Sequence, residues 1–354
     1  MADQDERIDR MSEENENRQR SRLVIRDIAE LAGVSVATVS RVLNTRPDVS
    51  PATRDLVLRH VRERGYVTSR NARALAGGRT GLIGLTVPYM LGDYFTQIVA
   101  GATDALYERD ARLVVCPTRY ECDREASLLQ RLMHGTTDGA LVILPSESPA
   151  ELAALHRQGY PFVVVDPPDT IHDGIPVISA AHWSGARIAT EHLLALGHQR
   201  IGVITGEREK CASRDRVAGY FSALLVAGLP ADRGLLVESD FSIDGGYAAA
   251  HDLLARPNAP TAIFALNDNM AVGVLRAARE RGLDVPGDLS VIGFDDVEMA
   301  SIVVPGLTTI RQPLQEMGRI AVGVLYRLLD GQSLDATRVE LSTKLVTRAT
   351  TGPP

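Results

Sequence analysis

The stretch Ile25–Asn44, IRDIAELAGVSVATVSRVLN, predicts two short helices joined by a tight turn. Its apolar residues recur at helical spacing, as Ile28, Ala29 and Leu31 in the first helix and Val39, Val42 and Leu43 in the second. Gly33 stands between the two helices, where a turn can use positive φ. Ser35 follows as the expected N-cap of the second helix, its hydroxyl accepting from a backbone N–H that lacks a helical partner.

Two helices joined by a glycine turn are typical of a helix-turn-helix, in which the second helix enters a DNA groove. An ordinary helical hairpin would show the same apolar pattern. The outward side chains of the second helix are small, hydroxylic, cationic or amide, the types that meet bases and phosphates. The predicted DNA contacts of this helix and its cap are Ser35, Val36, Ala37, Thr38, Ser40, Arg41 and Asn44.

Local charge favours the DNA-binding interpretation over the hairpin. The segment from Arg22 to Arg79 holds eleven arginines and five acidic residues, a net charge of +6, whereas the whole chain carries −7. The part that begins at Gly81 carries about −10. A basic module joined to an acidic body indicates a polyanionic partner.

The sequence AGVSVATVSRVLN, followed by Pro47 and by the helix start Ser50–Arg54, resembles the LacI/GalR family of bacterial repressors. The resemblance implies an all-α helix-turn-helix head and an α/β core with the type I periplasmic-binding-protein fold. Such a core has two doubly wound subdomains, between which the chain crosses three times. We expect the crossings near Ser179–Ala181, Leu307–Arg311 and Leu341–Lys344.

These patterns predict the domain boundaries. Residues 1–21 form a disordered acidic tail, 22–67 the head and 68–80 a hinge helix or linker. Residues 81–180 and 309–341 form the N-terminal core subdomain, and 181–308 and 342–354 form the C-terminal one. In the head, Ser50 should cap a third helix that starts at Pro51 and stops at Gly65. That helix should pack through Leu56, Val57 and Val61, with Tyr66 closing the small core.

The segment SRNARALAGGRT, residues 69–80, is too short to hold a helix alone, so a flexible linker is one interpretation. The resemblance implies a hinge helix that forms when two subunits sit on DNA. By that resemblance Leu75 would wedge into the minor groove at the operator centre and kink the duplex. The neighbouring Arg70, Ala72 and Arg73 would accompany it on the DNA.

From Gly81 onward, apolar runs alternate with helical stretches. GLIGLTVP, ARLVVCPT, GALVILPS and PFVVVDPP read as buried parallel strands, and IGVIT, GLLVESD, AIFAL and LSVIGFDD form a second series. Helices are expected at Thr96–Arg109, Glu121–Met133, Ala150–Gln158, Arg214–Ala227, Ile243–Ala255 and Asn269–Arg281. The tail VELSTKLVTRAT should add closing strands.

Acids and amides follow several of these strands, at the sheet edge where α/β proteins bind ligands. A sugar needs carboxylates, amides and arginine for its hydroxyls and an aromatic for its ring face. The resemblance assigns effector contacts to Asp166, Arg216, Phe241, Asn267 and Asp295. Tyr94, Trp183 and Tyr89 could line the opening. We expect Asp268 and Asp296 to be helix caps rather than ligand contacts.

The sequence argues against an enzyme, because it has no nucleophile elbow, P-loop or dinucleotide fingerprint, and Gly206 reads as a lone turn glycine. Three cysteines without CxxC spacing predict no metal site, and no cofactor is expected. The sequence shows neither an apolar run of membrane-spanning length nor a secretory signal, so we expect a cytoplasmic protein. TTGPP follows the last strand without a leucine heptad, which favours a homodimer over a tetramer.

These features predict an effector-responsive repressor of carbohydrate-utilisation genes that binds a pseudo-palindromic double-stranded DNA operator and is released by a sugar inducer. The alternative is a cytosolic sugar-binding protein of the same fold without catalysis. Val24 departs from the family pattern, because the family usually has Thr before the first helix; one expected cap or phosphate contact should therefore be missing.

Overall fold

The computed structural model describes residues 23–43, 46–66, 79–90, 92–133, 137–145, 149–167, 170–171 and 174–354, without the side chains of residues 122–124. The chain divides between Thr80 and Gly81 into two units, which are described separately. Several predicted sites fall outside the described residues: the acidic tail, Asn44, Arg70, Ala72, Arg73 and Leu75.

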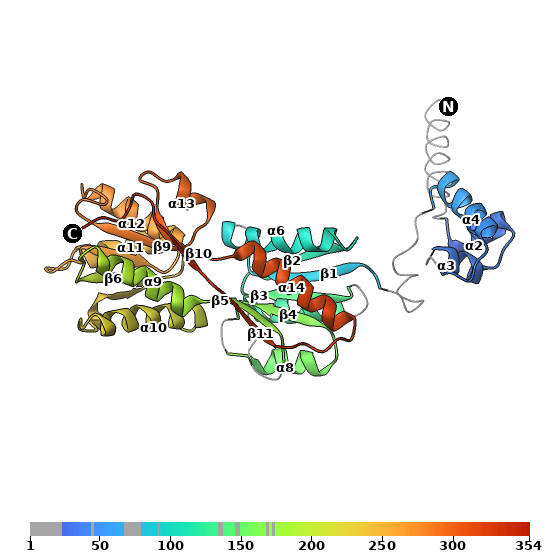
Figure 1. Ribbon diagram of the computed structural model, residues 1–354, viewed down its shortest axis with the longest axis horizontal. Coiled ribbons are helices and arrows are strands. Elements are labelled where there is room, and N and C mark those ends of the chain that lie inside the picture. Colours follow the sequence, from blue (N-terminus) through green and yellow to red (C-terminus); the bar gives the residue numbers. More distant parts are fainter. Residues whose placement is uncertain are drawn as a thin grey trace, which may run out of the picture. The chain divides into compact units, whose positions relative to one another are not determined.

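The first unit contains the helices α2 (Ile25–Ala32), α3 (Val36–Leu43) and α4 (Pro51–Glu63) (Figure 1). Gly33 ends α2 in the left-handed region, with φ of 61°, as the turn requires. The hydroxyl of Ser35 accepts from the backbone N of Thr38 at 3.0 Å, which confirms the predicted cap of α3. Val24 supplies no cap to α2; instead, the Asp27 carboxylate accepts from the Val24 backbone N at 2.7 Å.

A small apolar core holds the three helices together. Ile28, Val39, Val42 and Val57 are buried and Tyr66 closes the cluster, as predicted. The expectation for Leu31 and Leu56 is wrong, because these side chains are 41% and 37% exposed. In α2 the inward face consists of Ile28, Ala29 and Ala32, so Leu31 lies one position off the buried stripe.

The second unit contains two sheets whose strands are mainly parallel (Figure 1). The first has the order β11-β5-β4-β3-β1-β2. Its strands are β1 (Leu82–Val87), β2 (Arg112–Pro117), β3 (Gly139–Ile143), β4 (Phe162–Val165), β5 (Val177–Ala180) and β11 (Arg338–Leu341). Its helices are α6 (Asp93–Tyr107), α7 (Cys122–Arg131), α8 (Pro149–Arg157) and α14 (Leu314–Leu329).

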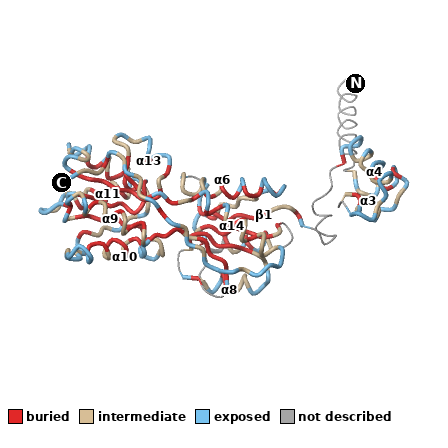
Figure 2. The backbone as a smooth tube through the Cα atoms, viewed as in Figure 1, coloured by how far each residue is buried: buried red, intermediate tan, exposed pale blue. Residues whose placement is uncertain are grey.

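The first sheet is buried on both faces, which explains its continuous apolar runs. Alternate residues of each strand point to opposite faces, so Leu141 packs in the cluster that includes α6 and α14, while Val142 packs with α7 and α8. Figure 2 shows these strands as buried segments between partly exposed helices. The late helix α14 thus belongs to the first subdomain, beside α6.

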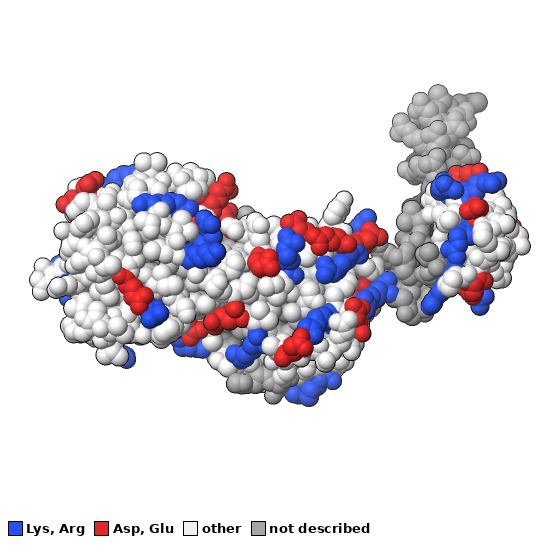
Figure 3. All heavy atoms as spheres, viewed as in Figure 1, with Lys and Arg blue, Asp and Glu red and all other residues white. Residues whose placement is uncertain are grey.

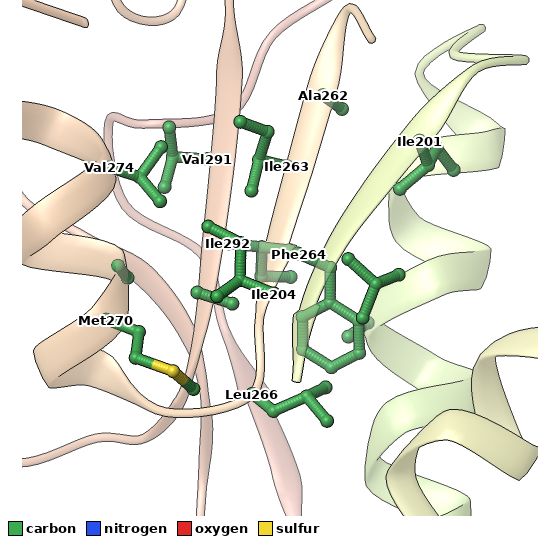
Figure 4. Packing of buried hydrophobic residues seen from close by; sticks show 14 of the residues in the cluster. Ile201, Ile204, Ala262, Ile263, Phe264, Leu266, Met270, Val274, Val291 and Ile292 are labelled. Atoms are coloured by element: carbon green, nitrogen blue, oxygen red, sulfur yellow. The ribbon is translucent and has the colours of Figure 1, made fainter. Parts of the chain in front are cut away.

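The second sheet has the order β12-β10-β9-β8-β6-β7. Its strands are β6 (Ile201–Thr205), β7 (Leu236–Glu238), β8 (Ala262–Ala265), β9 (Ser290–Asp295), β10 (Thr308–Arg311) and the antiparallel β12 (Lys344–Val346). Its helices are α9 (His182–Ala195), α10 (Cys211–Val226), α11 (Ile243–Leu254), α12 (Asp268–Glu280) and the short α13 (Glu298–Ile302). Figure 4 shows Phe264 and Ile263 of β8 in the core between β6 and α12.

The chain crosses between the two subdomains three times. The first crossing follows β5 at Ala181 and the third lies between Leu341 and Lys344, as predicted. The second was placed too early: Thr308–Arg311 pairs with β9 and β12 and therefore belongs to the second sheet. The crossing occurs at Gln312–Pro313, so residues 309–311 lie in the C-terminal subdomain and not in the N-terminal one.

The helices pack in close pairs through glycines. A Cβ on Gly101 of α6 would lie 1.8 Å from the backbone oxygen of Gln315, and one on Gly318 of α14 would lie 2.1 Å from that of Ile98. Gly219 of α10 lies equally close to the Trp183 backbone of α9. Backbones can approach this closely only where no side chain intervenes. None of the described helices has the length and apolar content to cross a membrane.

We predict that Gly101→Ala destabilises the core while Gly323→Ala does not. The added methyl at Gly101 meets backbone, so overpacking should lower the free energy of unfolding by roughly 1–3 kcal/mol. Gly323 lies in α14, the helix that packs against α6, but faces open space, so alanine there should stabilise the helix by roughly 0.5–1 kcal/mol. Urea denaturation of both variants tests this, and equal effects would contradict the close packing.

Candidate functional site

A cavity of about 200 Å³ lies between the two subdomains of the second unit. Both subdomains contribute to its wall, and the residues come from helix starts and strand ends. The first subdomain supplies Gly92, Asp93, Tyr94, Phe95, Tyr120, Leu144 and Asp166; the second supplies Lys210, Ala212, Arg216, Phe241, Asn267, Asn269, Asp295 and Val297. Six of the seven predicted effector contacts are therefore brought together.

The exception is Trp183, which does not line this cavity. Trp183 is the second residue of α9, 42% exposed, with the Arg187 guanidinium 5.4 Å from its ring centre. The preceding residue, His182, is buried instead and takes the inward position. Tyr89 also lies outside the cavity wall and packs edge-on against Tyr120, with ring centres 5.4 Å apart.

Aromatic rings from both subdomains face the cavity. Phe241 stands on one side, and Tyr120 and Phe95 stand on the other. Gly206 makes room for the Phe241 ring, because a Cβ there would lie 1.9 Å from the ring carbon Cζ. Its role is therefore more specific than that of a turn glycine. Rings placed in this way can cover the apolar face of a flat or cyclic ligand.

A chain of buried polar contacts runs beneath the cavity. The Tyr94 hydroxyl donates to Asp166 Oδ2, and Asp166 Oδ1 lies 2.9 Å from His182 Nε2. His182 Nδ1 lies 3.2 Å from Arg216 Nη2, which in turn lies 3.8 Å from Asp295 Oδ1. The Gln312 side-chain amide then donates to Asp295 Oδ1 at 2.6 Å.

The hydrogen-bond partners of His182 determine which of its ring nitrogens donates. A guanidinium can only donate, so Nδ1 of His182 must accept from Arg216. Nε2 of His182 is then the nitrogen that donates to Asp166. Neither His182 nor Gln312 lines the cavity, and the sequence predicted neither, because their roles depend on where the chain crosses between the subdomains.

The two cavity carboxylates differ in acidity. Burial acts to raise the pKa of Asp166, but the His182 ring, the Tyr94 hydroxyl and the Arg216 charge outweigh it and lower that pKa. Burial also raises the pKa of Asp295, and there the nearby Arg216 and Gln312 compensate less, so the pKa reaches about 7. Asp295 can therefore present either a carboxylate or a carboxylic acid to a ligand near neutral pH.

Two neighbouring carboxylates have structural roles, and neither is the predicted helix cap. Asn267 caps α12, its Oδ1 accepting from the Met270 backbone N at 2.9 Å. Asp268 instead accepts from the Val297 backbone N and the Thr309 hydroxyl, joining three segments of the second subdomain. Asp296 is paired with Arg311 and with Arg348, at 2.5 and 2.6 Å.

Backbone strain gathers at the cavity. Eight described non-glycine residues have positive φ, and five of them line the cavity wall: Tyr120, Leu144, Asp166, Phe241 and Asp295. Such conformations cost free energy and persist where the surrounding structure holds them for a function. This strain makes the cavity the candidate site.

The cavity wall also includes residues without a sequence prediction. Lys210 precedes α10, and its ammonium lies 4.5 Å from the centre of the Tyr120 ring, which belongs to the other subdomain. Asp93 and Asn269 stand in the first turns of α6 and α12. Their positions at the starts of helices that follow strands could have identified these residues from the sequence. No cluster of three or more metal-ligating side chains occurs among the described residues.

In the first unit, the outward face of α3 carries the predicted DNA contacts. Val36 and Ala37 are exposed at the start of the helix, beside the Ser35–Thr38 hydroxyl pair. Arg41 is more than half exposed and lies 3.5 Å from Asp48. Arg54 of α4 donates to the backbone oxygens of Val42 and Arg46. The helix therefore offers polar and cationic groups on a rigid support.

We predict that Asp295 makes stability depend on pH. Its pKa is raised in the folded state, so the native protein retains the proton to higher pH than the unfolded chain does. Stability should therefore fall as pH rises from about 4 towards 7, and Asp295→Asn should remove that part of the decline. Melting temperatures of both proteins across this range test the prediction; parallel curves would contradict it.

Comparison with known proteins gives the family. Residues 24–69 match the model for bacterial regulatory proteins of the lacI family, and residues 190–351 match the periplasmic binding protein-like domain. The ribose operon repressor of Escherichia coli (strain K12) is 36% identical over 330 residues, which cover 92% of this chain and 98% of the relative.

Two solved structures extend the likeness to the fold. The Lac repressor dimer bound to operator and the anti-inducer ONPF has a TM-score of 0.84 at 32% identity, covering 93% of this chain and 99% of that one. The complex of the transcriptional regulator CelR with cellobiose has a TM-score of 0.71 at 33% identity, covering 93% and 100%. The helix-turn-helix unit, the paired α/β subdomains and these matches together show that the chain belongs to the LacI family of DNA-binding transcriptional regulators and is not an enzyme.

Proposed function

We propose that the chain is a repressor whose affinity for operator DNA is controlled by a sugar bound in the cavity. The observation that carries this proposal is the cavity wall, which combines Asp166, Arg216, Asn267 and Asp295 with the ring of Phe241. Carboxylates and amides serve both the donors and the acceptors of hydroxyl groups, and a ring covers the apolar sugar face. Among relatives, one is named for the ribose operon and another was solved with cellobiose.

The size of the cavity favours a small sugar. Its volume of about 200 Å³ is below the roughly 300–1,000 Å³ of pockets for drug-sized ligands. A mono- or disaccharide is therefore a better match than a longer oligosaccharide. Asn269 is exposed within this wall and would offer both a donor and an acceptor to it.

We further propose that the protein acts as a homodimer on a pseudo-palindromic operator in the cytoplasm, where the DNA is. The Lac repressor structure similar to this chain is a dimer on its operator. Exposed apolar side chains at Met299, Ile302 and Val304 suit a subunit interface, since patches of this kind mark association sites. On DNA, α3 would enter the major groove and Leu75, with Arg70, Ala72 and Arg73, would engage the minor groove.

Sugar binding is tested by a thermal-shift panel that includes D-ribose and cellobiose. A sugar at 100 times its dissociation constant should stabilise the protein by about 2.7 kcal/mol, raising the melting temperature by several degrees. Asn269→Ala and Arg216→Ala should reduce this shift. Trp183→Ala is the control outside the cavity and should keep it. Loss of the shift in Trp183→Ala alone, or no shift with any sugar, would contradict the proposed site.

DNA binding is tested by its salt dependence. On DNA, Arg41 should exchange its contact with Asp48 for a contact with a phosphate or a base edge. Each phosphate contact adds about one to the slope of log affinity against log salt. Arg41→Ala should therefore weaken operator binding in fluorescence anisotropy, and the slope should fall if the contact is a phosphate.

Arg208→Ala is a matched control, since Arg208 is an exposed arginine of the second unit paired with Glu238. This variant should leave both the affinity and the slope unchanged. Sugar binding without any DNA binding by the wild type would instead favour a cytosolic sugar-binding protein.

A further inference from the structure

Two buried residues connect the cavity with the segments that join the subdomains. His182 directly follows the first crossing, and Gln312 lies in the second. Neither lines the cavity, yet each makes a hydrogen bond to a residue that does. Both side chains are almost completely buried, at 5% and 3% exposure, so water cannot replace their partners.

His182 connects a carboxylate of one subdomain with the arginine of the other. Its Nε2 faces Asp166, which follows β4, and its Nδ1 faces Arg216 of α10. The backbone next to it is also held, because the Ala181 N–H donates to the oxygen of Leu341 at the third crossing, at 2.8 Å. The His182 ring therefore links the position of Arg216 to the first crossing.

Gln312 plays the corresponding role at the second crossing. Its side-chain Nε2 donates to Asp295 Oδ1 at 2.6 Å, and its backbone N donates to the Asp295 carbonyl at 3.1 Å. Its Oε1 has no hydrogen-bond partner among the described residues. The amide is thus held by Asp295 alone, so its position follows that carboxylate.

The third crossing packs against the same centre. A Cβ on Gly185 of α9 would lie 2.7 Å from the Thr343 hydroxyl and 2.9 Å from the ring of Phe294. The Arg216 guanidinium lies 3.9 Å from the centre of that ring. Thr343 of the third crossing and the Phe294 ring, over which Arg216 lies, are therefore both next to Gly185, three residues after His182.

We propose that His182 and Gln312 are positioning residues that couple the first and second crossings to each other through Arg216 and Asp295. A sugar that engages these two cavity residues then changes both crossings together. Coupling of this kind needs an element that both sites bias, and the buried polar chain is that element. The regulatory meaning rests on the proposed function, whereas the coupling itself is a property of the protein without ligand.

The test uses hydrogen–deuterium exchange on the full-length protein without ligand, in two regions: residues 177–186 and residues 308–314. His182→Gln can keep both contacts, since its amide donates to Asp166 and its carbonyl accepts from Arg216. His182→Leu has similar bulk but neither contact. We expect His182→Leu to speed exchange in residues 308–314 by roughly tenfold, because the local opening there becomes easier. His182→Gln should stay near wild type.

The reciprocal variant is Gln312→Met, which keeps the side-chain length but cannot donate to Asp295. It should speed exchange in residues 177–186, whereas the control Gln315→Met, on the exposed face of α14, should not. Gln312→Met provides the measurement if His182→Leu fails to fold. The comparison depends on exchange in the distant region, which a local packing role would not change.

Two results would overturn the proposal. One is equal exchange in residues 308–314 for His182→Leu and His182→Gln. The other is an effect of Gln312→Met confined to its own region. These outcomes are separate from the sugar panel: failure of all sugars to bind would remove the proposed effector class and leave the exchange result standing.

Discussion

A buried guanidinium needs acceptors on every side, because an unpaired charge inside a protein is strongly destabilising. Arg216 is 4% exposed and meets most of this requirement with groups from both subdomains: the Leu266 carbonyl and Asp295 from its own, and Asp166 of the other through His182. Its Nε has no partner among the described residues. A ligand in the cavity would therefore meet charged groups that already have most of their hydrogen-bond partners.

The backbone is shaped to present these groups. Asp166 follows β4 and Asp295 is the last residue of β9, and both adopt positive φ where they line the cleft. Gly206 leaves room for the Phe241 ring, and glycines in the helix pairs let the layers approach closely. The charges on the visible face of the second unit are of mixed sign (Figure 3), so that face has no uniform surface potential.

Local features were predictable from sequence, and long-range ones were less so. The caps at Ser35 and Ser50 and the turn at Gly33 depend on neighbouring residues, and all three are present. Acids after strands could be assigned to one edge because parallel strands end together. His182 and Gln312 gave no such signal, since their roles depend on where the chain crosses. The second crossing was misplaced because β10 continues the second sheet as far as Arg311.

In the proposed function, sugar occupancy of the cleft and operator binding by the head are energetically linked. Linkage is reciprocal, so the most direct test is to measure the dissociation constant of the sugar twice. One titration uses the free protein and the other the protein saturated with its operator, with D-ribose or cellobiose as ligand, whichever binds. We predict weaker sugar binding on the operator, by the same factor by which the sugar weakens operator affinity. Identical dissociation constants in the two titrations would contradict it.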